Sequence, residues 1–376
     1  MRTRLPWLAL CATLCAILGA TWPATSAQAS APLFAGDTPL EISIAVDFGS
    51  LCRPRETETE DCDFTPSSLG YRDATGQMQS IPIEIKIRGG WRSLTQNCSV
   101  PLLWLRFEAS ETAGTPFEGQ TLLPLTTHCG KGLSLDPAQS GIRRSEYEQY
   151  LLREFLAHRL YNAVSDYSLR VRLLRVSYPK PGSGGSRARN WAFLSEHFDD
   201  MAARLGAERL PRGSFDATRL AAQHAARLAL FHYMIGNTDW SIARERNTVL
   251  LSLDDQQIPV PYDFDMSGLV NAGYAGPAPG LPIDDVRDRY FLGYCQPGTD
   301  WDRLFADFTA RREAILALGG TIPGLSRNGR RSTEYFLNGF FRIIGSVEER
   351  GARVVGGCQP WPPAAVDHTT PLEGRG

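Results

Sequence analysis

Hydrophobic and polar residues alternate along the first half of the chain, a pattern that predicts β-strands. Residues 40–48 (LEISIAVDF) and 81–88 (IPIEIKIR) alternate most clearly. Residues 100–108 and 121–127 continue the pattern, although Pro124 favours an edge or bulged strand because proline cannot donate a ladder hydrogen bond. We therefore expect a mostly antiparallel sheet in this half of the chain.

One long helix interrupts these strands. Residues 145–148 (SEYE) form a capping box, which predicts a helix from there to about Val164. Glu154 lies in the apolar stripe of this helix, and a buried carboxylate needs a partner. A glutamate at the edge of the stripe that reaches solvent is the alternative. Two more strands are expected at residues 169–178 and 190–198.

The pattern changes to a helical period from residue 199 onward. Helices are expected over residues 216–236 and near residues 301–318 and 332–348. A β-rich first half and a helical second half predict an α+β fold with two lobes that meet at a cleft.

The N-terminus has the pattern of an export signal. Two arginines precede an apolar stretch that runs to about Trp22, and residues 27–29 (AQA) offer a small-x-small cleavage site. This pattern predicts a secretory signal peptide over residues 1–29. No later apolar run has the length of a membrane span. We expect an exported protein, periplasmic or extracellular, with no membrane span.

Charge and composition narrow the partners. The 376 residues include 39 lysines and arginines and 41 aspartates and glutamates, for a net charge of −2. A nearly balanced charge does not indicate a polyanion such as a nucleic acid as partner. The proline-rich residues 358–376 predict a disordered tail.

The cysteines predict disulfides. Of the 8 cysteines, Cys11 and Cys15 lie in the signal segment. The remaining even number, in an oxidising compartment, suggests up to three bonds among about fifteen connectivities. No CxxC pair occurs and the 6 histidines are scattered, so a structural zinc site is not expected. Proximity in the sequence predicts the pairs Cys52–Cys62, Cys98–Cys129 and Cys295–Cys358.

A group of polar residues follows the helix over 216–236. Asn237 and Asp239 lie in the loop GNTDWS, and Asn247 opens the next apolar strand. A second strand then runs into Asp263-Phe264-Asp265. Side chains at alternate strand positions share a face, and two carboxylates on one face repel unless a cation or a donor lies between them. The alternative is an Asx-type turn, in which short acids cap backbone groups.

Phosphoryl transfer uses this set of groups. One carboxylate orients and deprotonates an attacking hydroxyl, while an asparagine and an aspartate hold Mg²⁺ against the phosphates of a nucleotide. The order observed here is a helix, an aspartate-bearing loop, an asparagine, a hairpin and then Asp-Phe-Asp. We therefore expect a nucleotide-dependent transfer to a hydroxyl acceptor.

These motifs resemble the protein-kinase-like superfamily, most of all its secreted spore-coat (CotH-type) branch and more distantly the HipA-type kinases. Those kinases carry an N-x-D…N segment followed by a Tyr-Asp-hydrophobic motif, which Asn237, Asp239, Asn247 and residues 262–265 match. The resemblance implies a two-lobed protein-kinase-like fold. A β-rich N-lobe with one long helix would span residues 30–198, and a helical C-lobe would span residues 199–357.

The resemblance also implies roles for individual residues. Asp239 would be the catalytic base, Asn247 and Asp263 would bind Mg²⁺ or Mn²⁺, and Asp265 would be a second metal ligand. ATP or another nucleotide would be the donor, and the acceptor would carry a hydroxyl group, with proteins as one class. Residues expected to bind the nucleotide are Lys86, Arg88, Glu154 and Glu196. Glu154 is expected to pair with Lys86 first and with Arg88 second.

Three features depart from ordinary kinases and keep other functions open. Asp239 and Asn247 are 8 positions apart, against about five in ordinary kinases. No Gly-x-Gly-x-x-Gly loop occurs, and Lys86 is the only lysine on a predicted strand. An arginine binds phosphate with a different geometry. The alternatives are a catalytically inert kinase-like scaffold and a secreted binding module.

Overall fold

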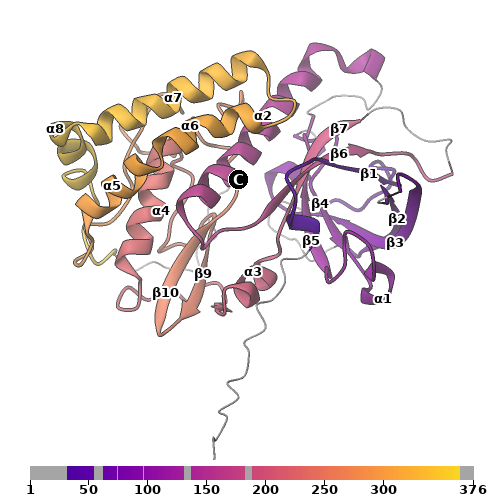
Figure 1. Ribbon diagram of the computed structural model, residues 1–376, viewed down its shortest axis with the longest axis horizontal. Coiled ribbons are helices and arrows are strands. Elements are labelled where there is room, and N and C mark those ends of the chain that lie inside the picture. Colours follow the sequence, from indigo (N-terminus) through magenta and orange to yellow (C-terminus); the bar gives the residue numbers. More distant parts are fainter. Residues whose placement is uncertain are drawn as a thin grey trace, which may run out of the picture. The chain divides into compact units, whose positions relative to one another are not determined.

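Strands from the first part of the chain form a closed barrel in the order β1-β2-β3-β4-β5-β7-β6 (Figure 1). The computed structural model describes residues 32–54, 62–73, 75–95, 97–130, 137–182 and 189–364, with the backbone alone for residues 137–145. The barrel strands are β1 (Leu40–Ile44), β2 (Thr65–Arg72), β3 (Met78–Ile87), β4 (Leu103–Arg106), β5 (Leu122–Thr126), β6 (Val171–Ser177) and β7 (Asn190–Ser195).

The barrel closes because β1 pairs with β6. This pair is parallel, with Leu40 opposite Leu174 and Ser43 opposite Ser177. The other neighbouring pairs in the barrel are antiparallel. Alternate side chains of each strand fill the interior, so that the four isoleucines of β3 are buried there with residues such as Leu105 and Leu125.

The predicted two-lobed protein-kinase-like fold is wrong. A closed barrel of mixed parallel and antiparallel strands replaces the expected mostly antiparallel N-lobe sheet. The alternation of apolar residues shows which side chains face a core, but it does not show that β1 and β6 meet. Pro124, which favoured an edge or bulged strand, instead lies in β5 between β4 and β7.

The long helix α2 (Pro137–Val164) packs against strands β6 and β7 and also against helices α4, α6 and α7. It begins at Pro137, before the predicted start at residue 145. Figure 1 shows α2 with the barrel strands on one side and α5 to α7 on the other. The remaining α-helices are α1 (Ala109–Thr112), α3 (Phe198–Arg204), α4 (Ala222–Ile235), α5 (Trp301–Ala310), α6 (Arg312–Thr321), α7 (Arg327–Gly345) and α8 (Val347–Arg350). Short 3-10 segments are η1 (Pro32–Phe34) and η2 (Trp91–Ser93), and a π-helical segment covers Gly351–Val355.

A second sheet has the order β10-β9-β8 and carries part of the candidate site. Its strands are β8 (Glu208–Arg209), β9 (Thr248–Leu253) and β10 (Gln256–Pro261). In the β9–β10 hairpin Thr248 pairs with Pro261, and the amide of Tyr262 donates a hydrogen bond to the carbonyl of Asn247 over 3.0 Å. The hairpin therefore brings Asn247 and the start of the Asp-Phe-Asp segment to the same end.

The three predicted disulfides are confirmed. Cys52 is bonded to Cys62, Cys98 to Cys129, and Cys295 to Cys358. Within the described ranges, no helix combines the length and the apolarity needed to cross a membrane. The predicted signal peptide over residues 1–29 and the end of the predicted tail, residues 365–376, lie outside the described residues.

Candidate active site

Asp239 follows the C-terminal end of α4. Gly236 ends this helix in a left-handed conformation with φ 62°, and a Cβ there would lie 2.9 Å from the ring of Phe336, so the position requires glycine. The side-chain oxygen of Asn237 then accepts a hydrogen bond from the amide of Asp239 over 2.9 Å. The loop is thus fixed by its own side chains, and Asp239 has a defined direction.

Two neighbours hold the carboxylate of Asp239. The side-chain nitrogen of Asn247 donates to the backbone oxygen of Asp239 over 2.8 Å and to its Oδ2 over 3.0 Å, and Arg246 forms an ion pair with Oδ1. Burial raises the pKa of Asp239 to about 6, and repulsion from Asp263 adds to this increase. The charge of Arg246 and the hydrogen bond from Asn247 lower the pKa, but they offset the effect of burial only in part. Asp239 is therefore an oriented carboxylate with a basicity above that of an ordinary aspartate.

Asn247 and Asp263 both adopt left-handed backbone conformations, with φ 49° and φ 60°. Asparagine and aspartate tolerate this region better than other residues with a Cβ, and such conformations concentrate at functional sites. Among the described residues, the carboxylate of Asp263 accepts a hydrogen bond from a side chain, that of Arg92, rather than from a backbone amide. This arrangement differs from the Asx-type turn.

Arg92 is the cation between the two aspartates. One terminal nitrogen lies 2.7 Å from Oδ1 of Asp263, and the other lies 3.5 Å from Oδ2 of Asp265 and 3.5 Å from Oε2 of Glu154. The ion-pair partner of Glu154 is therefore Arg92 rather than the predicted Lys86 or Arg88, although Arg88 also attracts its carboxyl group. The sequence correctly required a partner for this buried acid, but the partner comes from η2, after the strand.

The three carboxyls around Arg92 differ in their affinity for protons. Burial favours the neutral form of Asp263, but Arg92 and Arg88 outweigh it and hold its pKa below the usual value. Burial and repulsion from Asp263 and Glu154 raise the pKa of Asp265, despite the attraction of Arg92. Burial likewise raises the pKa of Glu154 to about 7. Of the three carboxyls, Asp263 is therefore the one that most readily keeps its negative charge.

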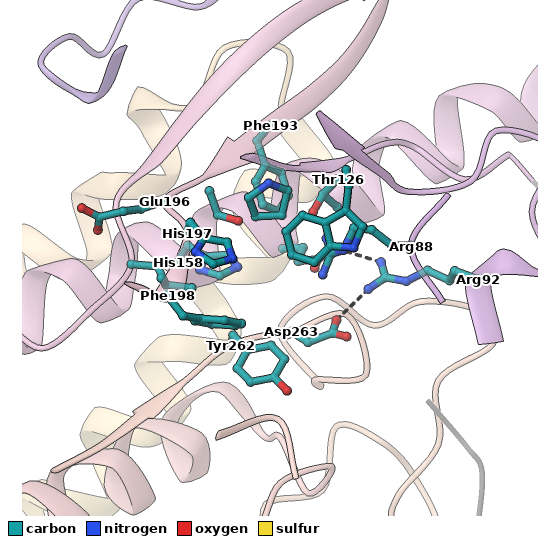
Figure 2. A pocket seen from close by; sticks show the side chains of 15 residues that line it. Arg88, Arg92, Thr126, His158, Phe193, Glu196, His197, Phe198, Tyr262 and Asp263 are labelled. Carbon is teal, nitrogen blue, oxygen red and sulfur yellow. Dashed lines mark hydrogen bonds and ion pairs between the residues drawn. The ribbon is translucent and has the colours of Figure 1, made fainter. Parts of the chain in front are cut away.

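Lys86, Arg88 and Glu196 lie in different environments. Because the isoleucines of β3 face the barrel interior, Lys86 points outward, with its side-chain nitrogen 5.8 Å from the ring centroid of Phe64, and it does not line the pocket described below. Arg88 lies 5.1 Å from the ring centroid of Trp104 and lines a pocket. Glu196 accepts hydrogen bonds of 2.8 and 2.7 Å from Arg204, and Figure 2 shows its carboxylate pointing away from the other labelled side chains.

The pocket beside Asp263 is partly open, and its empty volume of about 440 Å³ includes solvent outside its mouth. Arg88, Arg92 and Asp263 lie along it in Figure 2. It is rich in aromatic side chains, which no sequence motif indicates because they come from separate strands and loops. The full lining is Arg88, Arg92, Trp104, Pro124, Thr126, Glu154, His158, Leu169, Phe193, Ser195, Glu196, His197, Phe198, Tyr262 and Asp263.

The oxygen atoms near Asp263 suit a hard divalent cation. Asn247 uses its side-chain nitrogen to bind Asp239, which leaves its side-chain oxygen for another partner, and Asp263 and Asp265 add carboxylate oxygens. In the part of the chain that the structure describes, no group of three or more His, Cys, Asp or Glu side chains is arranged to hold a metal ion by itself. Magnesium commonly completes its shell with phosphate and water oxygens, so this donor set fits it.

Phe264 fixes the Asp-Phe-Asp segment in the core. Its ring is fully buried and packs against His158 and His232, with centroid distances of 4.6 and 5.9 Å. His232 is also stacked on Trp240 at 4.5 Å, and neither of its ring nitrogens forms a hydrogen bond within the described residues. Burial therefore places the pKa of His232 well below its usual value, since protonation would leave an unpaired buried charge.

His232 is expected to make the fold sensitive to acid. The unfolded chain takes up a proton at this residue below about pH 6.5, whereas the folded chain does not, so stability falls by up to about 1.4 kcal/mol per pH unit below that value. The change His232→Phe keeps the stacked ring and should reduce this slope by about one proton. Urea denaturation at pH 7 and pH 5 measures the effect. Equal losses in both proteins would contradict the expectation.

Comparisons with known proteins add little to this picture. No model of a protein family matches the chain, and no curated protein matches it. Among solved structures, it is similar to a chain of the Shewanella oneidensis MR-1 toxin–antitoxin complex of HipA, HipB and operator DNA, with 14% sequence identity and a TM-score of 0.31. The match covers 53% of this chain and 57% of that chain, so this chain spans little more than half of its length. The resemblance to the spore-coat branch stays a prediction.

Proposed function

We propose that this protein is a phosphotransferase that moves a phosphoryl group from a nucleotide to a hydroxyl acceptor with the help of Mg²⁺ or Mn²⁺. One observation carries the proposal. Asn247 donates two hydrogen bonds to Asp239 and, through the β9–β10 hairpin, lies at the same end as Asp263. A candidate base and two candidate metal ligands are thus assembled from separate parts of the sequence.

The pocket provides a place for the nucleotide. Trp104 and Tyr262 offer aromatic surfaces on which a base can stack, and Arg88 adds a positive charge for phosphate oxygens. Arg88 takes the role that a lysine has in ordinary kinases, whereas Lys86 lies outside the pocket. The carboxylate of Glu196 is bound by Arg204, so we assign it no contact with the nucleotide.

Asp239 supports the transfer by holding the acceptor. Its raised pKa of about 6 makes it a better proton acceptor than an ordinary aspartate, and Asn247 and Arg246 fix its direction. A metal ion bound by Asn247, Asp263 and Asp265 would supply charge neutralisation at the phosphates. Asp263 keeps its negative charge for this purpose, because Arg92 and Arg88 stabilise it.

The disulfides support an oxidising compartment as the working environment. All six cysteines outside residues 1–29 are bonded in pairs, a state that cytosolic reductants disfavour. This agrees with export to the periplasm or the extracellular space. The acceptor is then a molecule of that compartment that carries a hydroxyl group, and a protein side chain is one class.

The experiment is a binding and turnover assay with the full-length mature chain. Isothermal titration calorimetry with ATP, in Mg²⁺ and in EDTA, should show binding that depends on the metal. Incubation with ATP and candidate protein acceptors should then release ADP. Absence of ATP binding in both buffers would overturn the proposal and favour a binding module.

A catalytically inert scaffold is the second candidate, and one contact favours it. Arg92 already forms a 2.7 Å ion pair with Asp263, the central proposed metal ligand. In an inert protein this ion pair would be permanent and would replace the metal. Nucleotide binding that is unchanged by EDTA, together with no release of ADP, would identify this case.

A further inference from the structure

No sequence motif indicated Arg92, which contacts Glu154, Asp263 and Asp265. We call these three carboxyl side chains the acid group. Their arrangement suggests that Arg92 can exchange one carboxylate partner for another. We propose that Arg92 is an internal counter-cation of the metal site, which holds Asp263 and Asp265 together until a divalent cation displaces it from them. The inference rests on the proposed function, because it takes these two aspartates as metal ligands. It adds a positioning residue that sets how tightly the metal binds.

The geometry places Arg92 on the atoms that a metal ion would need. Its two terminal nitrogens contact Oδ1 of Asp263 at 2.7 Å and Oδ2 of Asp265 at 3.5 Å. The Arg92 side chain is only 11% exposed, so water does not screen these contacts strongly. A divalent cation on the same two carboxylates would repel the guanidinium at short range, and the two cations therefore compete.

Glu154 provides a partner for Arg92 after displacement. The guanidinium already lies 3.5 Å from Oε2 of Glu154, which is buried and is not one of the proposed metal ligands. A buried charge that loses its only partner is strongly destabilising, but here Arg92 passes from one carboxylate to another. Three acids around one arginine thus allow two paired arrangements, one with the metal and one without.

The backbone around Arg92 is held firmly, so the exchange takes place in the side chain. Arg53 donates hydrogen bonds to the backbone oxygens of Ser93 and Cys98, over 2.8 and 3.1 Å. The disulfide from Cys98 to Cys129 ties the end of this segment to the chain that follows β5. A fixed backbone with a long flexible side chain keeps Arg92 within reach of all three carboxylates.

The test measures Mn²⁺ affinity without nucleotide, from the electron paramagnetic resonance signal of free Mn²⁺ at constant pH. The variant Arg92→Met keeps the apolar stem and removes the charge. We expect its dissociation constant for Mn²⁺ to fall roughly tenfold. In this variant the metal no longer has to break a charge-assisted hydrogen bond, and the energy of one such bond corresponds to a change of about this size.

Arg227→Met is the matched control. Arg227 forms a 2.7 Å ion pair with Asp307, and its side chain is 16% exposed, close to the values for Arg92 and Asp263. It lies on α4 and its partner lies on α5, and neither residue lines the pocket beside Asp263. This variant should lose a similar amount of stability and bind Mn²⁺ as the wild-type protein does.

Each outcome decides the question. If the wild-type protein binds Mn²⁺ and Arg92→Met binds it equally or more weakly, the counter-cation role is overturned while the proposed function stands. If neither binds Mn²⁺, with or without ATP, the metal-dependent function fails and the inference fails with it. Should Arg92→Met not fold, Arg92→Lys replaces it. A single ammonium cannot span the three acids, so this variant should bind Mn²⁺ more tightly than the wild-type protein, and unchanged affinity would overturn the inference.

Discussion

Replacement of Asp239 by alanine is expected to slow phosphoryl transfer by roughly 10²–10⁴-fold, the usual contribution of a positioned general base. Nucleotide affinity should change little, because Asp239 does not line the pocket beside Asp263. The rate of ADP formation and the dissociation constant for ATP, measured on the same preparation, separate the two effects.

Asp239→Asn is the matched variant. An amide keeps the size of the side chain and its hydrogen bond with Asn247 but cannot take a proton from the acceptor. It should therefore lose nearly as much rate as Asp239→Ala while keeping more stability. A variant that loses ATP binding and rate together would show that Asp239 supports the fold of the site rather than the chemistry.

The second large effect concerns Asp263. The change Asp263→Asn should remove the metal-dependent part of nucleotide binding, because the metal then loses its most strongly charged ligand. Asparagine suits the left-handed conformation at φ 60° and so avoids the strain that alanine would introduce. The wild-type protein should gain about 2.7 kcal/mol at a Mg²⁺-ATP concentration a hundredfold above the dissociation constant. The variant should gain much less.

Thermal melts with and without Mg²⁺-ATP provide the measurement. In the absence of ligand, Asp263→Asn leaves Arg92 with Glu154 and Asp265 as partners, so a small loss of stability is expected. If the wild-type protein gains nothing from Mg²⁺-ATP while the variant melts several degrees lower, the Asp-Phe-Asp segment has a structural role only. The proposed function would then be wrong.

Local sequence patterns correctly predicted features that depend on neighbouring residues, such as the end of a helix and the buried face of a strand. The helix expected over residues 216–236 ends as predicted at Gly236, although α4 begins only at Ala222, and the alternation over residues 81–88 matches the buried face of β3. The boundaries were less accurate where two elements follow each other. One helix was expected near 301–318, whereas the chain forms α5 and α6 with a break at Arg311.

Contacts between distant parts of the chain were not predictable in the same way. The β2 segment, TPSSLGYR, has no regular apolar alternation and was not expected as a strand. Arg92 follows two glycines that end a strand, and the ion pair with Asp263 joins residues 171 positions apart. The sequence showed that Glu154 needs a cationic partner. It did not show which of the many arginines this is, because Arg92 comes close to Glu154 only in the folded chain.

Strands β6 and β7 have a consequence for how this protein unfolds. Leu174 and Leu194 belong to the interior of the barrel, while Leu173 and Phe193, on the opposite face, belong to the core formed with α2 and α4. Neither core can open without exposing the other, because they share these two strands. The barrel and the helices therefore unfold as one cooperative unit. A destabilising substitution on the far side of the barrel lowers the fraction of folded molecules, and with it the fraction in which the site around Asp239 is formed.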